Sequence, residues 1–286
     1  KGFFTIIITS FLFLLFSSSY IIYSKGLPKR FSTEVLSLID FNYEYKKIYQ
    51  TGSCHIENKK IFNDEFFSKC IVNKSNKKNL YIWGDSLGAH LYPGIKLKYE
   101  NNYNIFQRTV DACKPINTLN LVRKSLDNCK LINRFILNEI IKKKPDKIFL
   151  SGFWEEKDLK ELYSIVKILK KNNISEIYLF GPSPRWHDPL PKILYKKYRM
   201  LRKIPEYLFD ENHKKNFVLD EKFTTFSKNN KINYISPLRI LCKKENYTCL
   251  TKVGKEADSI VNWDENHFTE KGSIYIFSKF IDKKEY

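Results

Sequence analysis

Two short stretches of this chain carry residue types that can support nucleophilic catalysis. In the first, Gly84-Asp85-Ser86-Leu87 follows directly after the apolar run 80–83. A serine at a turn from a strand into a helix is exposed at the edge of a sheet. Its backbone N–H then lies at the helix N-terminus, where developing negative charge is stabilised. Ser86 is therefore a candidate nucleophile, although an ordinary helix N-cap serine fits the same four residues.

The second stretch is Asp264-Glu265-Asn266-His267, near the C-terminus. A serine hydroxyl is a poor nucleophile until a base removes its proton, and His267 can be that base. Asp264, three residues earlier, can accept a hydrogen bond from the other ring nitrogen and fix the tautomer. An aspartate and a histidine in a solvated loop are the alternative. Together the two stretches predict a Ser–His–Asp site, which is a much stronger signal than either stretch alone.

Such a site needs a scaffold that brings residues 86 and 267 together, and the apolar pattern supplies one. Short apolar runs alternate with longer amphipathic segments from residue 79 onward. The expected strands are 80–83, 104–109, 147–152, 176–182 and 232–237, and the expected helices are 119–143, 159–169, 208–228 and 268–281, the last with Thr269 as N-cap. This alternation predicts an α/β fold, with a parallel sheet covered by helices on both faces. Ligands bind such sheets beyond the carboxyl ends of the strands.

The N-terminal segment predicts a membrane helix. No charged residue occurs from Gly2 to Ser24, and this length suffices to cross a hydrocarbon core of ~30 Å. A signal peptide would have a shorter apolar stretch and a small-residue cleavage site. We therefore expect a transmembrane helix over residues 1–24, a linker over 25–50 and one enzyme-like domain over 51–286.

The cysteines favour a location outside the cytoplasm. They are Cys54, Cys70, Cys113, Cys129, Cys242 and Cys249. No pair has the C-x-x-C spacing of a zinc or redox site. They form three couples close in sequence, so we expect the disulfides 54–70, 113–129 and 242–249 among the connectivities that six cysteines allow. Six buried thiols are the alternative, but a preceding membrane segment favours disulfides, which persist outside the cytoplasm.

The composition limits the partners. The net charge is +19, and lysines scattered along the chain dominate it. A lysine-rich solvated surface explains this charge, and a surface that faces anionic lipid or acidic polysaccharide is also compatible with it. No recognisable nucleic-acid module accompanies the charge, so we expect no nucleic-acid partner. No cluster of metal-ligating residues is visible in the sequence, so we expect no metal site.

The two motifs also carry a family resemblance. LYIWGDSLGAHL and, near the C-terminus, DENHFTEKGS resemble the SGNH, or GDSL, hydrolase superfamily. More narrowly, the chain resembles the extracytoplasmic SGNH domains fused to membrane O-acyltransferases of the acyltransferase-3 family, which follow a last transmembrane helix and a linker. The spacing Gly84-x-Ser86-x-Gly88 also fits the nucleophile elbow of α/β-hydrolases. In that fold, however, the acid and the histidine are usually far apart in sequence, whereas here they are three residues apart.

The resemblance implies a three-layer α/β/α sandwich of flavodoxin-like topology, with Ser86 as nucleophile, His267 as base and Asp264 as orienting acid. The residues expected to form the oxyanion hole or to bind substrate are Gly84, Asp85, Ala112, Cys113 and Trp154. Three departures from the family pattern are visible. Leu87 replaces the usual histidine after the serine. No clear second-block glycine occurs in 110–115, and 151–154 lacks the third-block asparagine. These losses would shift the oxyanion hole onto backbone N–H groups of residue 86 and the 112–113 turn.

Other residues are weaker candidates. Trp186-His187-Asp188 lies in a proline-rich loop and could line a substrate cleft, although a structured loop without a role in binding is the simpler interpretation. His90, on the helix after the serine motif, is expected to be a packing or surface residue.

Three functions fit these observations. The first is a periplasmic domain, anchored in the bacterial inner membrane, that transfers acetyl to a sugar hydroxyl of a surface polysaccharide such as the lipopolysaccharide O-antigen. Acetyl-CoA would then be the donor for an acyltransferase-3 membrane domain in the full-length chain, and this chain would hold no cofactor. The second is a carbohydrate esterase with the same triad. The third is a non-catalytic module that binds glycan or positions the membrane part, which the missing asparagine and glycine favour and the complete Ser–His–Asp set opposes.

Overall fold

A six-stranded parallel sheet forms the centre of the structure, a computed structural model that describes residues 2–39, 41–57, 65–70, 76–116, 124–256 and 259–280. The strand order is β1-β3-β2-β4-β5-β7, and every neighbouring pair is parallel. The strands are β1 His55–Ile56, β2 Lys78–Gly84, β3 Tyr103–Val110, β4 Lys147–Ser151, β5 Ile177–Phe180 and β7 Asn233–Ile235. The five predicted strands are confirmed. The two-residue edge strand β1 was not predicted, because so short a run has no recognisable period.

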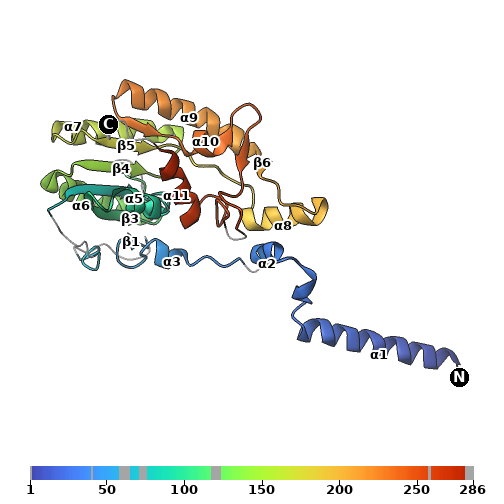
Figure 1. Cartoon of the computed structure of the whole chain (residues 1–286). Helices are drawn as coiled ribbons and strands as arrows, with labels where there is room; N and C mark the ends of the chain where they lie inside the picture. Colours follow the sequence, from blue (N-terminus) through green and yellow to red (C-terminus); the bar gives the residue numbers. More distant parts are fainter. Residues whose placement is uncertain are drawn as a thin grey trace.

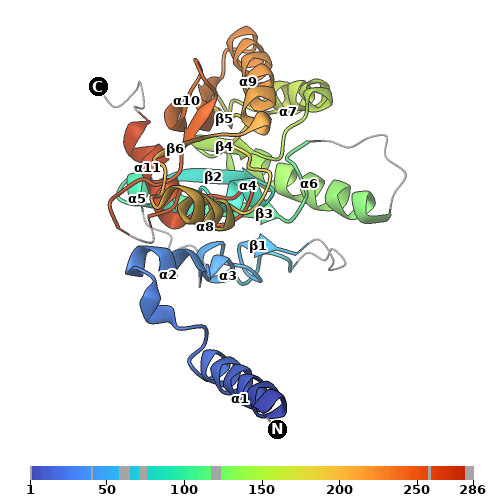
Figure 2. The same cartoon turned by 90° about the vertical axis from the view of Figure 1, so that its right-hand side faces the viewer.

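The sheet separates two hydrophobic cores, and the alternation of side chains along each strand shows why. In β2, Tyr81 and Trp83 point into one core, whereas Leu80 and Ile82 point into the other. The first core packs under α6 Lys124–Lys143 and α7 Leu159–Lys171, and the second under α5 Tyr92–Tyr99 and α11 Glu270–Lys279. Figure 2 shows α6 and α7 to one side of the sheet and α5 and α11 to the other. This three-layer sandwich confirms the predicted fold class.

Four further helices and a small second sheet complete the domain. The helices are α4 Ser86–Ala89, α8 Leu190–Leu201, α9 Glu211–Asn229 and α10 Pro237–Leu241. Of these, α4 packs against β2, β3 and β4, and α9 packs against β7. The second sheet is antiparallel, with the order β6 Tyr207–Phe209, β9 Thr248–Leu250, β8 Cys242–Lys243. The helix predicted over 119–143 has its residues 119–123 outside the described part of the chain. Thr269 caps α11 as predicted, since its side chain accepts from the backbone N–H of Gly272.

All three predicted disulfides are present. Cys54 is bonded to Cys70, Cys113 to Cys129 and Cys242 to Cys249. The first ties the start of β1 to a following turn, and the second ties the turn after β3 to α6. The third closes the β8–β9 hairpin. In the chain-entropy model, a covalent loop of this size, 16 residues for each of the first two, contributes about 3 kcal/mol.

The segment before the sheet differs from the expected linker. The apolar helix α1 Gly2–Tyr23 extends away from the domain with none of its residues buried (Figure 1), and it is long and apolar enough to cross a membrane. After it come α2 Thr33–Ile39, which packs against α8, and α3 Tyr45–Ile48. Val35, Leu38 and Tyr49 are buried. The described residues 33–39 and 41–49 are therefore part of the folded domain. These helices are only one or two turns long, too short to show a clear hydrophobic period.

Candidate active site

The two sequence motifs meet at the carboxyl edge of the sheet. Ser86 opens α4 directly after β2, and His267 precedes α11, 181 residues later in the chain. The Oγ atom of Ser86 lies 2.8 Å from Nε2 of His267, and Nδ1 of His267 lies 2.7 Å from Oδ2 of Asp264. A carboxylate can only accept, so Nδ1 carries the proton and Nε2 accepts from the serine hydroxyl. This is the arrangement in which the imidazole can remove the serine proton.

Asp264 is fixed by its own backbone contacts. Its Oδ1 accepts from the backbone N–H groups of Asn266 at 2.8 Å and His267 at 2.7 Å, which leaves Oδ2 for the imidazole. Burial alone would raise the pKa of Asp264, but the hydrogen bonds and charge of His267 and the backbone donors lower it below its ordinary value. The carboxyl is therefore ionised at neutral pH and can stabilise an imidazolium.

A stack of aromatic rings supports the other side of the imidazole. The Trp263 indole lies nearly parallel to the His267 ring, with centroids 5.5 Å apart, and Tyr45 stacks on Trp263 at 4.9 Å. The indole Nε1–H donates to the hydroxyl of Tyr49 at 3.0 Å. Tyr43 also stacks on the indole. The segment between the apolar helix and the sheet thus supports the ring of His267, a contact that the linker prediction missed.

Two of the residues predicted to form the oxyanion hole or bind substrate, Gly84 and Asp85, stabilise the backbone of the turns at the carboxyl edge of the sheet. Asp85 is buried; its carboxylate accepts from the N–H of Leu87 at 2.8 Å and of Phe153 at 2.7 Å. It therefore joins the turn after β2 to the turn after β4. Burial raises the pKa of Asp85 to about 6, although both backbone hydrogen bonds oppose the shift. A Cβ atom at Gly84 would lie 2.2 Å from the backbone oxygen of Ser151, so only glycine allows this approach.

The turn predicted to form part of the oxyanion hole leaves one of its two backbone N–H groups without an acceptor among the described residues. Cys113 cannot offer its N–H to a substrate, because that group already donates to the carbonyl of Val110 at 3.0 Å. Ala112 has a φ of 54°, in the left-handed region that glycine prefers. The turn thus keeps a glycine-like backbone although the glycine is missing. Within the described residues, the N–H groups of Ala112 and Ser86 have no hydrogen-bond acceptor.

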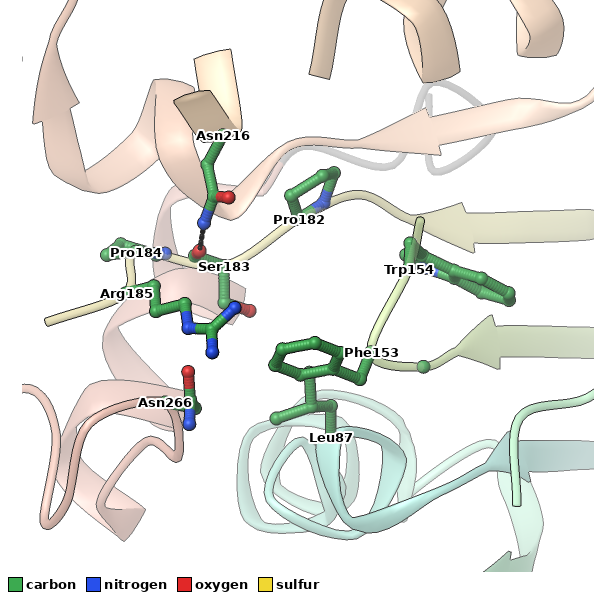
Figure 3. A pocket seen from close by; sticks show the side chains of 10 residues that line it. Leu87, Phe153, Trp154, Pro182, Ser183, Pro184, Arg185, Asn216 and Asn266 are labelled. Carbon is green, nitrogen blue, oxygen red and sulfur yellow. Dashed lines mark hydrogen bonds between the residues drawn. The ribbon is translucent and has the colours of Figure 1, made fainter. Parts of the chain in front are cut away.

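Trp154 does not offer its indole to a substrate. Its side chain is buried, its Nε1–H donates to the carbonyl of Phe180 at 2.7 Å, and its ring contacts Phe223 in the core. Figure 3 shows the indole directed away from the other side chains of the cleft. The predicted contact between Trp154 and substrate is wrong for the indole, because the side chain fills the space between β4, β5 and α9.

The weaker candidates are structural. His90 is buried beside His267, and its Nδ1 accepts from the backbone N–H of Phe268 at 3.1 Å. Burial, reinforced by the positive charge that His267 can carry, holds the pKa of His90 well below its usual value. Trp186 is buried and donates to Asn262, and His187 binds Asp210 at 2.6 Å. These contacts confirm the interpretation of residues 186–188 as a structured loop.

A cleft lies next to the triad, and its lining includes the chain neighbours of two triad residues. Leu87 follows the serine and Asn266 precedes the histidine; both face the cleft together with Phe153 and Arg185. In Figure 3 the Arg185 guanidinium lies between the phenyl ring of Phe153 and the amide of Asn266. Sequence reasoning missed this group. Phe153 follows a predicted strand end and could have been suspected, whereas nothing local distinguishes Arg185 from other surface arginines.

Comparison with known proteins identifies the family. The family model of the SGNH domain fused to AT3 domains matches residues 53–282. The chain therefore belongs to this family. It is an enzyme of the SGNH type, an acyltransferase or an ester hydrolase.

Among solved structures, the chain is similar to the periplasmic domain of a lipopolysaccharide acetyltransferase from Salmonella ser. Paratyphi A. The two are 26% identical with a TM-score of 0.73, and the match covers 86% of this chain and 97% of that one. A GDSL-like lipase from Bacteroides thetaiotaomicron is more distant, 14% identical with a TM-score of 0.42 over 70% of this chain and 84% of the lipase. No match was found among curated protein sequences.

Proposed function

We propose that this chain is the extracytoplasmic part of a membrane O-acetyltransferase that acetylates a sugar hydroxyl of a cell-surface polysaccharide, such as the lipopolysaccharide O-antigen. The observation that carries the proposal is the continuous hydrogen-bond chain from Ser86 through His267 to Asp264, within a domain of this family. The likeness to the Salmonella acetyltransferase domain supports transfer over hydrolysis.

In the first step, the Oγ atom of Ser86 attacks the carbonyl carbon of the acetyl donor while Nε2 of His267 takes the hydroxyl proton. The negative charge that develops on the carbonyl oxygen is stabilised by the backbone N–H groups of Ser86 and Ala112, which replace the side-chain donor of the family pattern. The C–O or C–S bond to the donor then breaks, and the leaving group receives the proton from His267. The product is acetyl-Ser86.

In the second step, a hydroxyl of a sugar bound in the cleft attacks the carbonyl carbon of acetyl-Ser86 and gives its proton to His267. The bond to Oγ breaks, the proton returns to Ser86, and the acetylated sugar leaves. Water in place of the sugar would give an esterase with the same residues. Asp264 stabilises the imidazolium in both steps and is not itself protonated.

We further propose that α1 anchors the chain in the bacterial inner membrane with the SGNH domain in the periplasm. The apolar length of α1 supports the anchor, and the three disulfides support the oxidising compartment. In the full-length protein, the fused AT3 membrane domain would supply acetyl groups from acetyl-CoA, and no donor cofactor would reside in this chain.

The experiment that tests the proposal is hydrolysis of p-nitrophenyl acetate by the oxidised chain in detergent, compared with Ser86→Ala. Activity that depends on Ser86 supports the nucleophile. Adding a surface polysaccharide then separates the two enzymatic candidates, because a transferase yields acetylated polysaccharide and an esterase yields only acetate. A folded wild-type chain with no Ser86-dependent activity would contradict catalysis and favour a module that only binds glycan.

A further inference from the structure

The cleft beside the triad contains a positive charge without a carboxylate partner. The Arg185 side chain is exposed, and within the described part of the chain it forms no ion pair. Other basic residues of the domain form ion pairs with carboxylates. Lys114, near the turn after β4, binds Glu155 and Asp158. Arginines on other faces are also neutralised: the pairs are Arg108–Glu139 and Arg239–Asp220. Arg185 therefore provides a cation at the cleft that the described residues do not neutralise.

The backbone places this arginine next to the catalytic histidine. The residue that follows it, Trp186, donates its backbone N–H to the carbonyl of Glu265 at 2.9 Å, which fixes the loop after β5 to the loop before α11. The carbonyl of Ser183 accepts from the side chain of Asn216 at 2.8 Å, as Figure 3 shows. Two prolines, at positions 182 and 184, restrict the backbone between them. The loop is therefore preorganised, and binding a ligand there costs little ordering.

Phe153 orients the guanidinium. The Cζ atom of Arg185 lies 4.7 Å from the centroid of the Phe153 ring, a cation–π contact that leaves the edge of the guanidinium available. Phe153 is 37% exposed, and its backbone N–H donates to the carboxylate of Asp85. The ring thus adds an apolar surface, on which the C–H face of a sugar can pack, to a donor edge that suits a carboxylate or a phosphate.

We propose that this cleft recognises an anionic sugar, with its carboxylate or phosphate bound to the edge of the Arg185 guanidinium and its ring against Phe153. The inference rests on the proposed function and adds the class of acceptor, an acidic glycan. Asn266, which lines the cleft near the arginine and directly precedes His267 in the chain, contributes an amide for a sugar hydroxyl. A sugar bound there presents a neighbouring hydroxyl group toward Ser86 and His267. The negative charge of the acceptor thus determines which sugar binds before the acetyl group is transferred.

The test measures sugar binding without catalysis. The chain carrying Ser86→Ala, in an uncharged detergent, is titrated at low ionic strength with three probes: methyl glucoside, methyl glucuronide, and glucose with a phosphate on its primary hydroxyl. Saturation-transfer NMR gives the three affinities. A charge-assisted, bidentate contact should make at least one anionic sugar bind about tenfold or more tightly than the glucoside. The anion with the higher affinity identifies the group that the cleft prefers.

Two further variants decide whether the contact is specific. Arg185→Gln, made with Ser86→Ala, should reduce the affinity for the anionic sugar to that for the glucoside. Arg199→Gln, at an exposed arginine in the last turn of α8, is the matched control and should leave the preference intact. Equal affinities for all three sugars would overturn the inference, as would an equal loss in both variants, which indicates nonspecific attraction to a basic surface. Esterase activity that depends on Ser86 is a separate readout, so failure of the proposed function is distinguishable from failure of this inference.

Discussion

Replacing Asp264 by asparagine changes one atom of the triad and should reverse the tautomer of the imidazole. The side-chain oxygen of asparagine can keep the two backbone hydrogen bonds that Oδ1 of Asp264 accepts. The NH₂ group then takes the place of Oδ2, 2.7 Å from Nδ1 of His267. Because NH₂ can only donate, Nδ1 must give up its proton, and Nε2 then carries the proton and faces Ser86 as a donor.

An imidazole in this tautomer cannot accept the serine proton. The equivalent exchange in serine proteases lowers kcat about 10⁴-fold, which corresponds to about 5.5 kcal/mol of transition-state stabilisation. The fold should survive, because only one charge-assisted hydrogen bond is lost, at a cost of about 2 kcal/mol in the free energy of unfolding. The expected phenotype is therefore a folded chain that has lost nearly all of its esterase activity.

The assay is kcat/KM for p-nitrophenyl acetate near neutral pH, together with thermal unfolding. Asp188→Asn is the matched control, since this carboxylate binds two lysines at the surface and touches no triad residue. The control should keep the wild-type rate. If Asp264→Asn retains more than about a tenth of the wild-type kcat/KM, the tautomer argument is refuted, and His267 is oriented by its stacking contacts alone.

Three further substitutions test the supports of the site. In Gly84→Ala, the new Cβ collides with the backbone oxygen of Ser151, so the free energy of unfolding should fall by about 3 kcal/mol. The control Gly254→Ala, whose new Cβ makes only ordinary van der Waals contact with the side chain of Ser259, should change the melting temperature little. Burial raises the pKa of Asp85 to about 6 from 3.8, so its contribution to stability is complete below pH 3.8 and is lost as the pH rises through about 6. Between pH 4 and pH 7, the free energy of unfolding should therefore fall less in Asp85→Asn than in the wild type, by up to about 3 kcal/mol. Denaturant titrations that give the same pH dependence of the unfolding free energy in both proteins would contradict this. Trp263→Ala removes the ring stacked on the imidazole and should lower kcat by up to about tenfold at an unchanged KM; steady-state kinetics with an unaltered kcat would show that the stack has no positioning role.

The sequence predicted the parts of this structure that depend on local pattern. Apolar runs identified the five longer strands, because strands buried on both faces are nearly continuous in hydrophobicity. The serine turn and the D-x-x-H motif predicted that Ser86, His267 and Asp264 lie together, and the hydrogen bonds between them have that geometry, which depends on one turn after β2 and one loop before α11. Thr269, a residue type favoured at helix N-caps, predicted the start of α11.

The parts that sequence reasoning missed depend on contacts between distant segments. Tyr43 and Tyr45, before β1, lie in a stretch with no recognisable hydrophobic period. Both stack on Trp263, which lies more than two hundred positions later in the chain. Asp85 looked like a substrate contact because it adjoins the serine, yet its partner is a backbone group after β4. Trp154 was misjudged for the same reason. A polar or aromatic residue near a catalytic motif can equally well hold the scaffold.

In the proposed reaction, Ser86 carries the acetyl group between donor and acceptor. The most direct test incubates the oxidised chain with p-nitrophenyl acetate, quenches with acid before turnover is complete, and maps acetylation by peptide mass spectrometry. We expect an acetyl group on the peptide that contains Ser86, absent from Ser86→Ala and discharged by an added glycan acceptor. Turnover with no acetyl group on Ser86, or with acetylation at another residue required for activity, would contradict it.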